Sequence, residues 1–147
     1  MDSASLKDIG ILSWTKFTCG TERHLLSGMP LSVGVYVILL GNRQLRIRGS
    51  SDIAYIGKAT NQRGLRGRIS QYFHPGPTQS TNIAMNQRLH VADCALRIGF
   101  VSADSVQAAR RLESDLLLQF EKEHGERPPY NKQRALDLMS RLAEGEF

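Results

Sequence analysis

The sequence contains little cysteine and no long hydrophobic run. Its two cysteines, Cys19 and Cys94, form no CxxC pair, and two thiols so far apart exclude a disulfide framework and a cysteine-based zinc site. We expect both to be buried thiols. No stretch approaches the roughly eighteen apolar residues of a membrane helix, and residues 1–10 lack the basic start and apolar run of a signal peptide. These absences predict an intracellular, cytoplasmic protein that does not bind membrane.

Length and composition limit the number of domains. A chain of 147 residues with 41% hydrophobic residues can bury one core but leaves no room for a second domain. No internal repeat or low-complexity tract interrupts it. We therefore expect a single domain over residues 1–147.

Positive charge is concentrated in one segment. The net charge is +5, but residues 43–68 carry seven Lys and Arg against one Asp, a local charge of +6. Such a segment would attract a polyanion, and a nucleic-acid backbone is the obvious one. A solvated arginine-rich loop explains the charge equally well. Charge alone leaves both interpretations open.

The pattern of apolar residues predicts alternating strands and helices. Runs rich in β-branched and aromatic residues predict strands, and apolar residues at helical spacing predict helices. The predicted elements are a strand at 33–40, an antiparallel strand at 44–57 that is bulged or interrupted, helices at 65–73 and 82–91, a strand at 94–101, a long helix from Ser102 or Asp104 to about Glu123, and a closing helix at 132–143. This order is typical of an α/β sandwich with a small central antiparallel β-sheet flanked by helices.

One carboxylate falls on the apolar side of the long helix. Glu113 lies between Ala109 and Leu117, on the seam that should face the core. An unpaired buried charge costs several kcal/mol, so it must meet a cation, a metal ion or several hydrogen-bond donors. A salt bridge to one of the many arginines is the simpler interpretation, favoured about two to one when these residues are taken alone.

Two tyrosines fall beside glycines in adjacent predicted strands. Tyr36 follows Gly34 closely, and Tyr55 precedes Gly57. Glycine weakens a strand interior unless another group must approach the backbone closely, which suggests the floor of a cleft. Tyrosine also fills strands well without any such role.

Five short motifs then occur in one order. They are Gly34-Val35-Tyr36, Tyr55-Ile56-Gly57-Lys58, Gly67-Arg68-Ile69-Ser70-Gln71-Tyr72-Phe73, Leu112-Glu113-Ser114-Asp115-Leu116 and Pro128-Pro129-Tyr130-Asn131. Together they resemble the motifs of the GIY-YIG nuclease family and span residues 34–131. The resemblance implies a GIY-YIG nuclease-like fold and an endonuclease that hydrolyses phosphodiester bonds of DNA. It also favours a metal ligand over a salt bridge at Glu113.

The resemblance implies a role for each catalytic residue. Glu113 would hold one Mg²⁺ or Mn²⁺ per active site, and Arg68 would stabilise charge on the phosphate by a forked contact. Tyr36 would accept a proton from the attacking water, which demands that its pKa be lowered by nearby positive charge. Tyr55 would position phosphate or water, and Lys58 would orient Tyr36 or contact the phosphate.

The loop before Arg68 departs from the family pattern. It is a few residues longer than in compact members, so Arg66 competes with Arg68 for the catalytic position. The distance to Tyr72-Phe73 favours Arg68. The polar loop 76–82 could touch DNA or serve as a surface turn.

Further residues are expected to bind DNA or to support the fold. The expected DNA contacts are Arg63, Arg66, Tyr72, His74 and Asn82, although His74 beside Pro75 could instead be structural. The residues expected to be structural are Gly34, Gly57 and Asn131, the last packing sheet and helix together.

The resemblance also divides the chain. Residues 1–32 would be an N-terminal extension, residues 33–131 the GIY-YIG-like catalytic core and residues 132–147 a C-terminal helix. DNA is the expected partner, and a homodimer would let one active site act on each strand. Two alternatives are a nucleic-acid-binding module that does not cut and a metal-independent structural protein.

Overall fold

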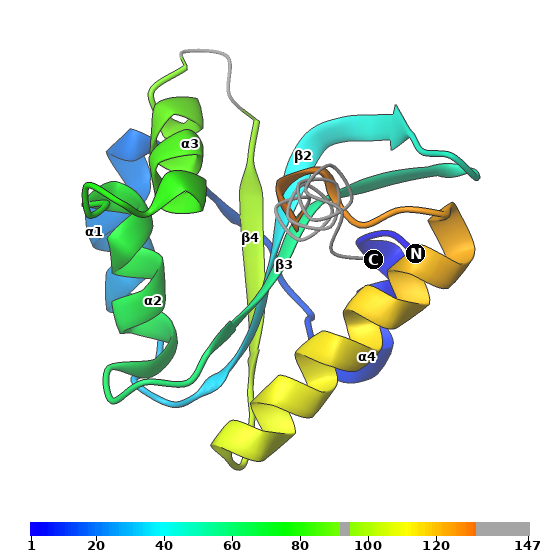
Figure 1. The fold of residues 1–147 in the computed structure, drawn as a ribbon. Coiled ribbons are helices and arrows are strands. Elements are labelled where there is room, and N and C mark those ends of the chain that lie inside the picture. Colours follow the sequence, from blue (N-terminus) through cyan, green and yellow to red (C-terminus); the bar gives the residue numbers. More distant parts are fainter. Residues whose placement is uncertain (92–94, 132–147) are drawn as a thin grey trace, which may run out of the picture.

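A four-stranded antiparallel sheet forms the centre of the protein. The computed structural model describes residues 1–91 and 95–131, and in these the strand order is β1-β4-β2-β3 (Figure 1). The strands are β1 (Thr15–Lys16), β2 (Gly34–Leu45), β3 (Ser50–Ala59) and β4 (Arg97–Ser102). All three pairings are antiparallel. The prediction of an α/β protein with a small central antiparallel sheet is confirmed, whereas the C-terminal helix expected at 132–147 lies outside the described residues.

Helices cover both faces of this sheet. One face carries α1 (Glu22–Ser27), α2 (Gly64–Phe73) and α3 (Ser80–Leu89), and the other carries α4 (Val106–His124) with the 3-10 helix η1 (Ala4–Ile9) (Figure 1). Two further 3-10 turns are η2 (Cys19–Thr21) and η3 (Pro129–Asn131). Cys19 is exposed, which corrects the expectation of a buried thiol, and Cys94 lies outside the described residues.

Strand β2 separates two hydrophobic cores. Because successive side chains of a strand point to opposite faces, its apolar run is buried on both sides, as expected for a strand covered by helices on each face. The side chains on the α2 side are Tyr36, Ile38 and Leu40, and those on the α4 side are Val35, Val37 and Leu39. In the pairing with β3 the register shifts after Ile38, where β3 has one residue more than β2, so the predicted bulge in the second strand is confirmed. The predicted bounds of that strand are wrong, because Gln44 and Leu45 belong to β2 and the chain turns at residues 46–49.

Residues 1–32 are built into the fold. β1 pairs with β4, with Thr15 opposite Ile98. Leu6 and Ile11 are buried in the core on the α4 side, and Phe17 in the core on the α2 side. The segment is therefore not an extension of a separate core, because it completes the sheet and both of its hydrophobic layers.

Three arginines of the basic segment hold the β2–β3 hairpin in place. Their partners are Asp2 for Arg43, Glu126 for Arg46 and the carbonyl of Lys122 for Arg48. The hairpin tip extends toward the end of α4, away from α2 (Figure 1). Arg43 lies seven residues along β2 from Tyr36, about 23 Å at 3.3 Å per residue. The +6 segment is thus not one patch, because nearly half of its cations have structural partners at the far end of the sheet.

Helix α4 starts at a serine cap. The Ser105 hydroxyl accepts a hydrogen bond from the Ala108 amide at 3.0 Å, so the helix begins at Val106, slightly later than predicted. Gly125, with φ of +78°, ends it as predicted. In the described part of the chain, no helix is long and apolar enough to cross a membrane.

Candidate active site

Tyr36 and Tyr55 lie against Gly57 on the face of the sheet that α2 covers. Gly57 pairs with Tyr36 across the two strands, and the two tyrosine ring centroids are 6.0 Å apart. A Cβ atom on Gly57 would lie 2.5 Å from Cζ of Tyr36 and 2.6 Å from Cε1 of Tyr55. Glycine is therefore required here, because two aromatic rings approach the backbone from one side.

Helix α2 adds a third tyrosine to this group. The Tyr72 hydroxyl lies 2.5 Å from the Tyr36 hydroxyl, and both side chains are fully buried. We refer to Tyr36, Tyr55 and Tyr72 as the tyrosine cluster. Direct contact between Tyr72 and DNA, which the sequence led us to expect, is contradicted by this burial.

The pKa of Tyr36 shifts in the direction opposite to the expected one. Burial raises it well above 10, Tyr72 and Tyr55 raise it further, and Arg68 lowers it only in part. Burial also raises the pKa of Tyr72. The expectation of a lowered pKa is wrong for this structure, because removal from water opposes the charged phenolate more than nearby cations favour it.

Arg68 is the arginine that joins the tyrosine cluster. Its Cζ lies 4.9 Å from the centroid of the Tyr72 ring, within the range of a cation–π contact, and it also interacts with Tyr55. Burial acts to lower the pKa of Arg68, but the tyrosine hydroxyls raise it more, so the guanidinium stays charged.

Two amide side chains hold the Arg68 guanidinium in place. Nη1 donates to Oε1 of Gln71 at 2.9 Å and to Oδ1 of Asn82 at 3.0 Å. Asn82 is only 4% exposed, which contradicts its expected direct contact with DNA and makes it a support for Arg68. Arg66, by contrast, donates from Nε to the carbonyl of Met29. Of the two competing arginines, Arg68 alone reaches the tyrosine cluster.

The Lys58–Glu113 ion pair lies on the opposite face of β3. Lys58 follows Gly57 directly, so its side chain points toward α4 rather than α2. Its Nζ lies 3.1 Å from Oε1 of Glu113, whose side chain is 15% exposed. Glu113 thus occupies the seam position that the sequence predicted, with a lysine as its partner. The expected catalytic residues are therefore divided between the two faces of β3, with Glu113 and Lys58 on the α4 side and the tyrosine cluster on the α2 side.

Asn131 covers the open edge of β3 at Ile56. Its Oδ1 accepts from the Ile56 amide and its Nδ2 donates to the Ile56 carbonyl, each at 3.0 Å. The side-chain amide therefore takes the place of a neighbouring strand at one residue of the edge. This geometry agrees with the structural role predicted for Asn131. Gly34 is also structural, since a Cβ there would lie 2.3 Å from the carbonyl oxygen of Val101.

The start of α2 depends on a residue that sequence reasoning missed. Gly64 has φ of +57°, and a Cβ there would lie 2.3 Å from the carbonyl oxygens of Leu31 and Ser32. The amides of Leu65 and Arg66 donate to the carbonyls of Ser32 and Pro30, which satisfies N–H groups that a helix start leaves open. In the sequence, the glycine just before the apolar helical pattern, in the Arg63-Gly64 pair, could have indicated that the helix starts with a residue of positive φ.

A polar hollow of about 400 Å³ opens beside Arg68. Its lining residues are Arg68, Gln71, Thr78, Gln79, Ser80, Thr81 and Asn82, a set with one cation and no carboxylate. A second hollow, of about 360 Å³, lies on the other side of Gln71 and includes Arg63. His74 is exposed at the end of α2, with Nε2 2.5 Å from Oε1 of Glu22.

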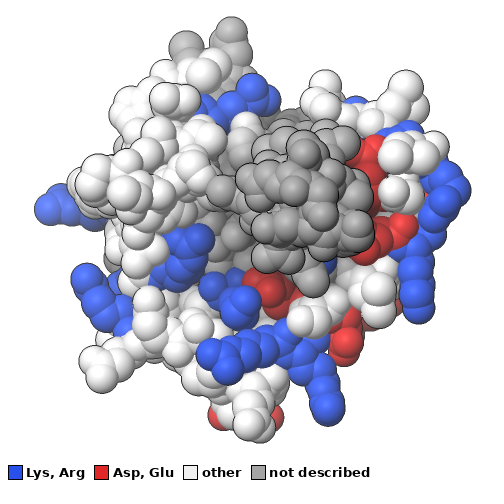
Figure 2. Space-filling model, viewed as in Figure 1, with Lys and Arg blue, Asp and Glu red and all other residues white. Residues whose placement is uncertain are grey.

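Positive charge lies around the polar hollow beside Arg68. Lys and Arg side chains gather over α2 and the beginning of α4 (Figure 2). β3, α2 and the loop that joins them carry four cations: Lys58, Arg63, Arg66 and Arg68. This half of the basic segment is the part that could attract a polyanion.

Glu113 offers an oxygen ligand for a divalent ion. Within residues 1–91 and 95–131, no three His, Cys, Asp or Glu side chains are grouped to hold a metal. Mg²⁺ usually keeps several waters and binds through one or two carboxylates together with substrate phosphates. The donor set here fits that kind of site, one that water and phosphate complete, and does not fit an all-protein cage.

The fold and site together define an α/β protein whose edge strand β3 carries an arginine–tyrosine cluster on one face and a lysine–carboxylate pair on the other. The sequence matches no family model and no curated protein.

Proposed function

We propose that this protein is a divalent-metal-dependent endonuclease that hydrolyses phosphodiester bonds of DNA inside the cell. The proposal is supported by the motif resemblance and by one observation above all. Of the two competing arginines, only Arg68 interacts with Tyr55, on the α2 side of β3. On the α4 side of the same strand, Lys58 pairs with Glu113, the residue predicted to bind the metal. A substrate phosphate at the edge of β3 would meet both groups.

Arg68 and Tyr55 would contact the phosphate on the α2 side. The guanidinium is charged, and Gln71 and Asn82 restrict its orientation, so it can stabilise the extra negative charge without reorganising. Tyr55 is half-buried and is the member of the tyrosine cluster that a substrate can reach. Its hydroxyl would donate a hydrogen bond to a phosphate oxygen.

Glu113 and Lys58 would act from the α4 side. Glu113 would hold the metal, and Lys58, which is 37% exposed, would balance its charge before DNA arrives and contact the phosphate afterwards. When bound, a divalent ion supplies a water of lowered pKa and charge neutralisation at the phosphate.

Tyr36 has a different role in this proposal from the one that the family resemblance implied. A fully buried phenol with a raised pKa is a poor proton acceptor in the free protein. We therefore propose that Tyr36 is a positioning residue for Arg68. Its hydroxyl bonds the Tyr72 hydroxyl, and the Arg68 guanidinium lies over the Tyr72 ring.

DNA would extend from this edge over the polar hollow beside Arg68. Side chains such as Thr78 and Gln79 there are of the kind that bind phosphates and sugars. Lys58 on β3 and Arg63 at the start of α2 add positive charge to the two ends of this path, so affinity should fall steeply as salt concentration rises.

The second candidate is a nucleic-acid-binding module that does not cut. Two observations favour it: the Tyr36 hydroxyl is already bonded to Tyr72, and Glu113 is already paired with Lys58. A binder would show the same salt dependence without any turnover.

A plasmid assay separates the two candidates. Supercoiled DNA would be incubated with the protein and Mg²⁺ or Mn²⁺, with EDTA as the metal-free control. Nicking that EDTA stops supports the nuclease, whereas salt-dependent binding with no nicking supports the module. Arg68→Ala should reduce nicking by about 10³-fold, the scale of an arginine that stabilises a phosphoryl transition state. Arg66→Ala removes the same charge from the same helix without touching the tyrosine cluster, so it is the matched control and should nick at nearly the wild-type rate when the DNA is saturated with protein.

A further inference from the structure

One side of α4 faces away from the sheet and carries an ordered set of exposed residues. We call it the outer stripe: Ala108, Arg111, Asp115, Leu118 and Lys122. All five are exposed, and Leu118 is 52% exposed despite being a large apolar residue. Residues three and four apart in a helix lie on one side, so these side chains form a continuous line.

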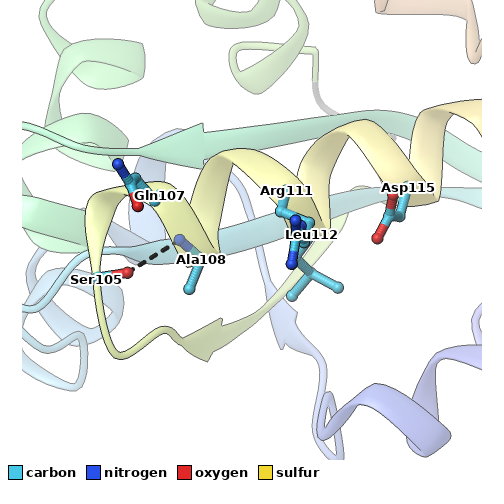
Figure 3. A pocket seen from close by; sticks show the side chains of 6 residues that line it. All are labelled: Ser105, Gln107, Ala108, Arg111, Leu112 and Asp115. Atoms are coloured by element: carbon cyan, nitrogen blue, oxygen red, sulfur yellow. Dashed lines mark hydrogen bonds between the residues drawn. The ribbon is translucent and has the colours of Figure 1, made fainter.

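A hollow of about 600 Å³ lies along the first half of this stripe. It is lined by Ser105, Gln107, Ala108, Arg111, Leu112 and Asp115. Figure 3 shows Ala108, Arg111 and Asp115 projecting to the same side of the helix. The small side chain of Ala108 leaves room there for a larger apolar group.

The charges along the outer stripe are complementary to those of a second α4 that runs in the opposite direction. If two copies of α4 pack antiparallel with their two-fold axis at the level of residue 113, Arg111 of each copy faces Asp115 of the other. Ala108 then faces Leu118, and Asp104, just before the helix, faces Lys122. A two-fold contact must be self-complementary in this way.

The two charges at the centre of this contact are available for it. Among the residues that the structure describes, neither Arg111 nor Asp115 belongs to an ion pair. They stand one turn apart on the same helix, yet they do not bridge each other. Leu118 lies outside both hydrophobic cores of the described chain, so its apolar surface faces solvent.

We propose that the outer stripe binds a second copy of this chain through an antiparallel pair of α4 helices. Leu118 of each copy fills the hollow at Ala108 of the other, and two Arg111–Asp115 pairs fix the register. A helix of 19 residues is about 28 Å long, and one helix pair buries less than the roughly 1,200 Å² of a stable interface. The dimer should therefore be weak and concentration-dependent.

The proposed interface leaves the candidate active site uncovered. Glu113 is two residues from both Arg111 and Asp115, so it lies on the opposite side of the helix, where it meets Lys58. The two sites of a dimer would face away from each other. They would act independently instead of cutting the two strands of one duplex together.

Sedimentation equilibrium from micromolar to submillimolar concentration tests the proposal. The wild type should dimerise, and Arg111→Glu should weaken the dimer by about tenfold or more, because attraction becomes repulsion at two symmetric pairs. Asp115→Arg should do the same. An equimolar mixture of the two variants should recover dimerisation as a heterodimer. In the mixed pair the two substituted positions face each other with opposite charges, and the native Asp115 of one copy faces the native Arg111 of the other.

Arg110→Glu is the matched control, because it makes the same charge change at the neighbouring exposed residue outside the stripe. It should leave the dimer unchanged, and circular dichroism would verify that each variant is folded. A wild type that stays monomeric overturns the proposal, as does a mixture that dimerises no better than the separate variants. These outcomes are independent of nuclease activity, because the association constant is measured without DNA or metal.

Discussion

The hydroxyls of Tyr36 and Tyr72 lie 2.5 Å apart in the interior, one on β2 and the other on α2. Both side chains are fully buried, so the contact joins strand to helix at the point where Arg68 crosses the Tyr72 ring. Because burial raises the pKa of each tyrosine, both hydroxyls stay protonated. A buried, protonated hydroxyl that is already bonded to Tyr72 is not the proton acceptor that the family resemblance implied for Tyr36.

The first prediction concerns stability at high pH. The pKa values of Tyr36 and Tyr72 are raised above about 10, the value of an unfolded tyrosine. Their contribution to stability should be complete below pH 10 and lost as the pH rises further, because only the unfolded chain then releases these protons. Each should steepen the fall of the free energy of unfolding by up to about 1.4 kcal/mol per pH unit. Urea unfolding of the wild type and Tyr36→Phe from pH 8 to 11 measures this, and identical slopes would contradict it.

The second prediction concerns the glycine beneath the two rings. Gly57→Ala should destabilise the protein by about 1–3 kcal/mol, the range for overpacking a core, because its Cβ would meet both tyrosines. It should also abolish cleavage by displacing Tyr55. Gly20→Ala is the control, since the nearest atom to a Cβ there is 4.0 Å away, and its effect should stay within about 0.5 kcal/mol. Equal urea midpoints for the two variants would show that Gly57 is not crowded in solution.

The third prediction separates the two tyrosines on the strands. Tyr55→Phe removes the reachable hydroxyl and should lower the single-turnover cleavage rate by about 10²-fold, the scale for a lost transition-state donor. Tyr36→Phe removes a buried hydroxyl and should lower it by about tenfold or less. Measured at equal metal and DNA concentrations, a larger loss in Tyr36→Phe would mean that this hydroxyl becomes exposed and takes part in proton transfer.

The fourth prediction concerns the edge of β3. Asn131→Ala leaves the amide and carbonyl of Ile56 without their partner and should reduce the free energy of unfolding by about 1–2 kcal/mol. Asn131→Asp should cost at least as much, because a carboxylate cannot donate to the Ile56 carbonyl. Asn61→Ala, at an exposed position, serves as the control in the same urea titration. An unchanged Asn131→Ala midpoint would exclude this edge contact.

Elements with a strong period were predictable from the sequence. The apolar run of β2 and the seam of α4 follow from burial on one or both faces, and the position of Glu113 follows from the same periodicity. The contact of Arg68 with Tyr72, four residues further along α2, follows from helical spacing, whereas the catalytic role of Arg68 stays a prediction from the family resemblance. These features depend on local pattern, which a single sequence contains.

Features that depend on distant contacts were not predictable. The place of Phe17 in the core on the α2 side requires β1 to pair with β4, and a two-residue strand has no period. The burial of Asn82 depends on Arg68 in a different helix. Likewise, the separation of Lys58 from the tyrosine cluster depends on which helix covers each face of β3.

The most direct test of the nuclease proposal is a single-turnover cleavage measurement on a labelled DNA duplex with Mg²⁺. It would compare the wild type with Glu113→Gln, which keeps the shape of the side chain but removes its charge. Asp8→Asn, at an exposed carboxylate, is the matched control. We expect cleavage by the wild type and Asp8→Asn at similar rates and a loss of about 10²-fold or more in Glu113→Gln. Cleavage by Glu113→Gln at the wild-type rate, or a wild type that binds the duplex without cutting it, would contradict the account.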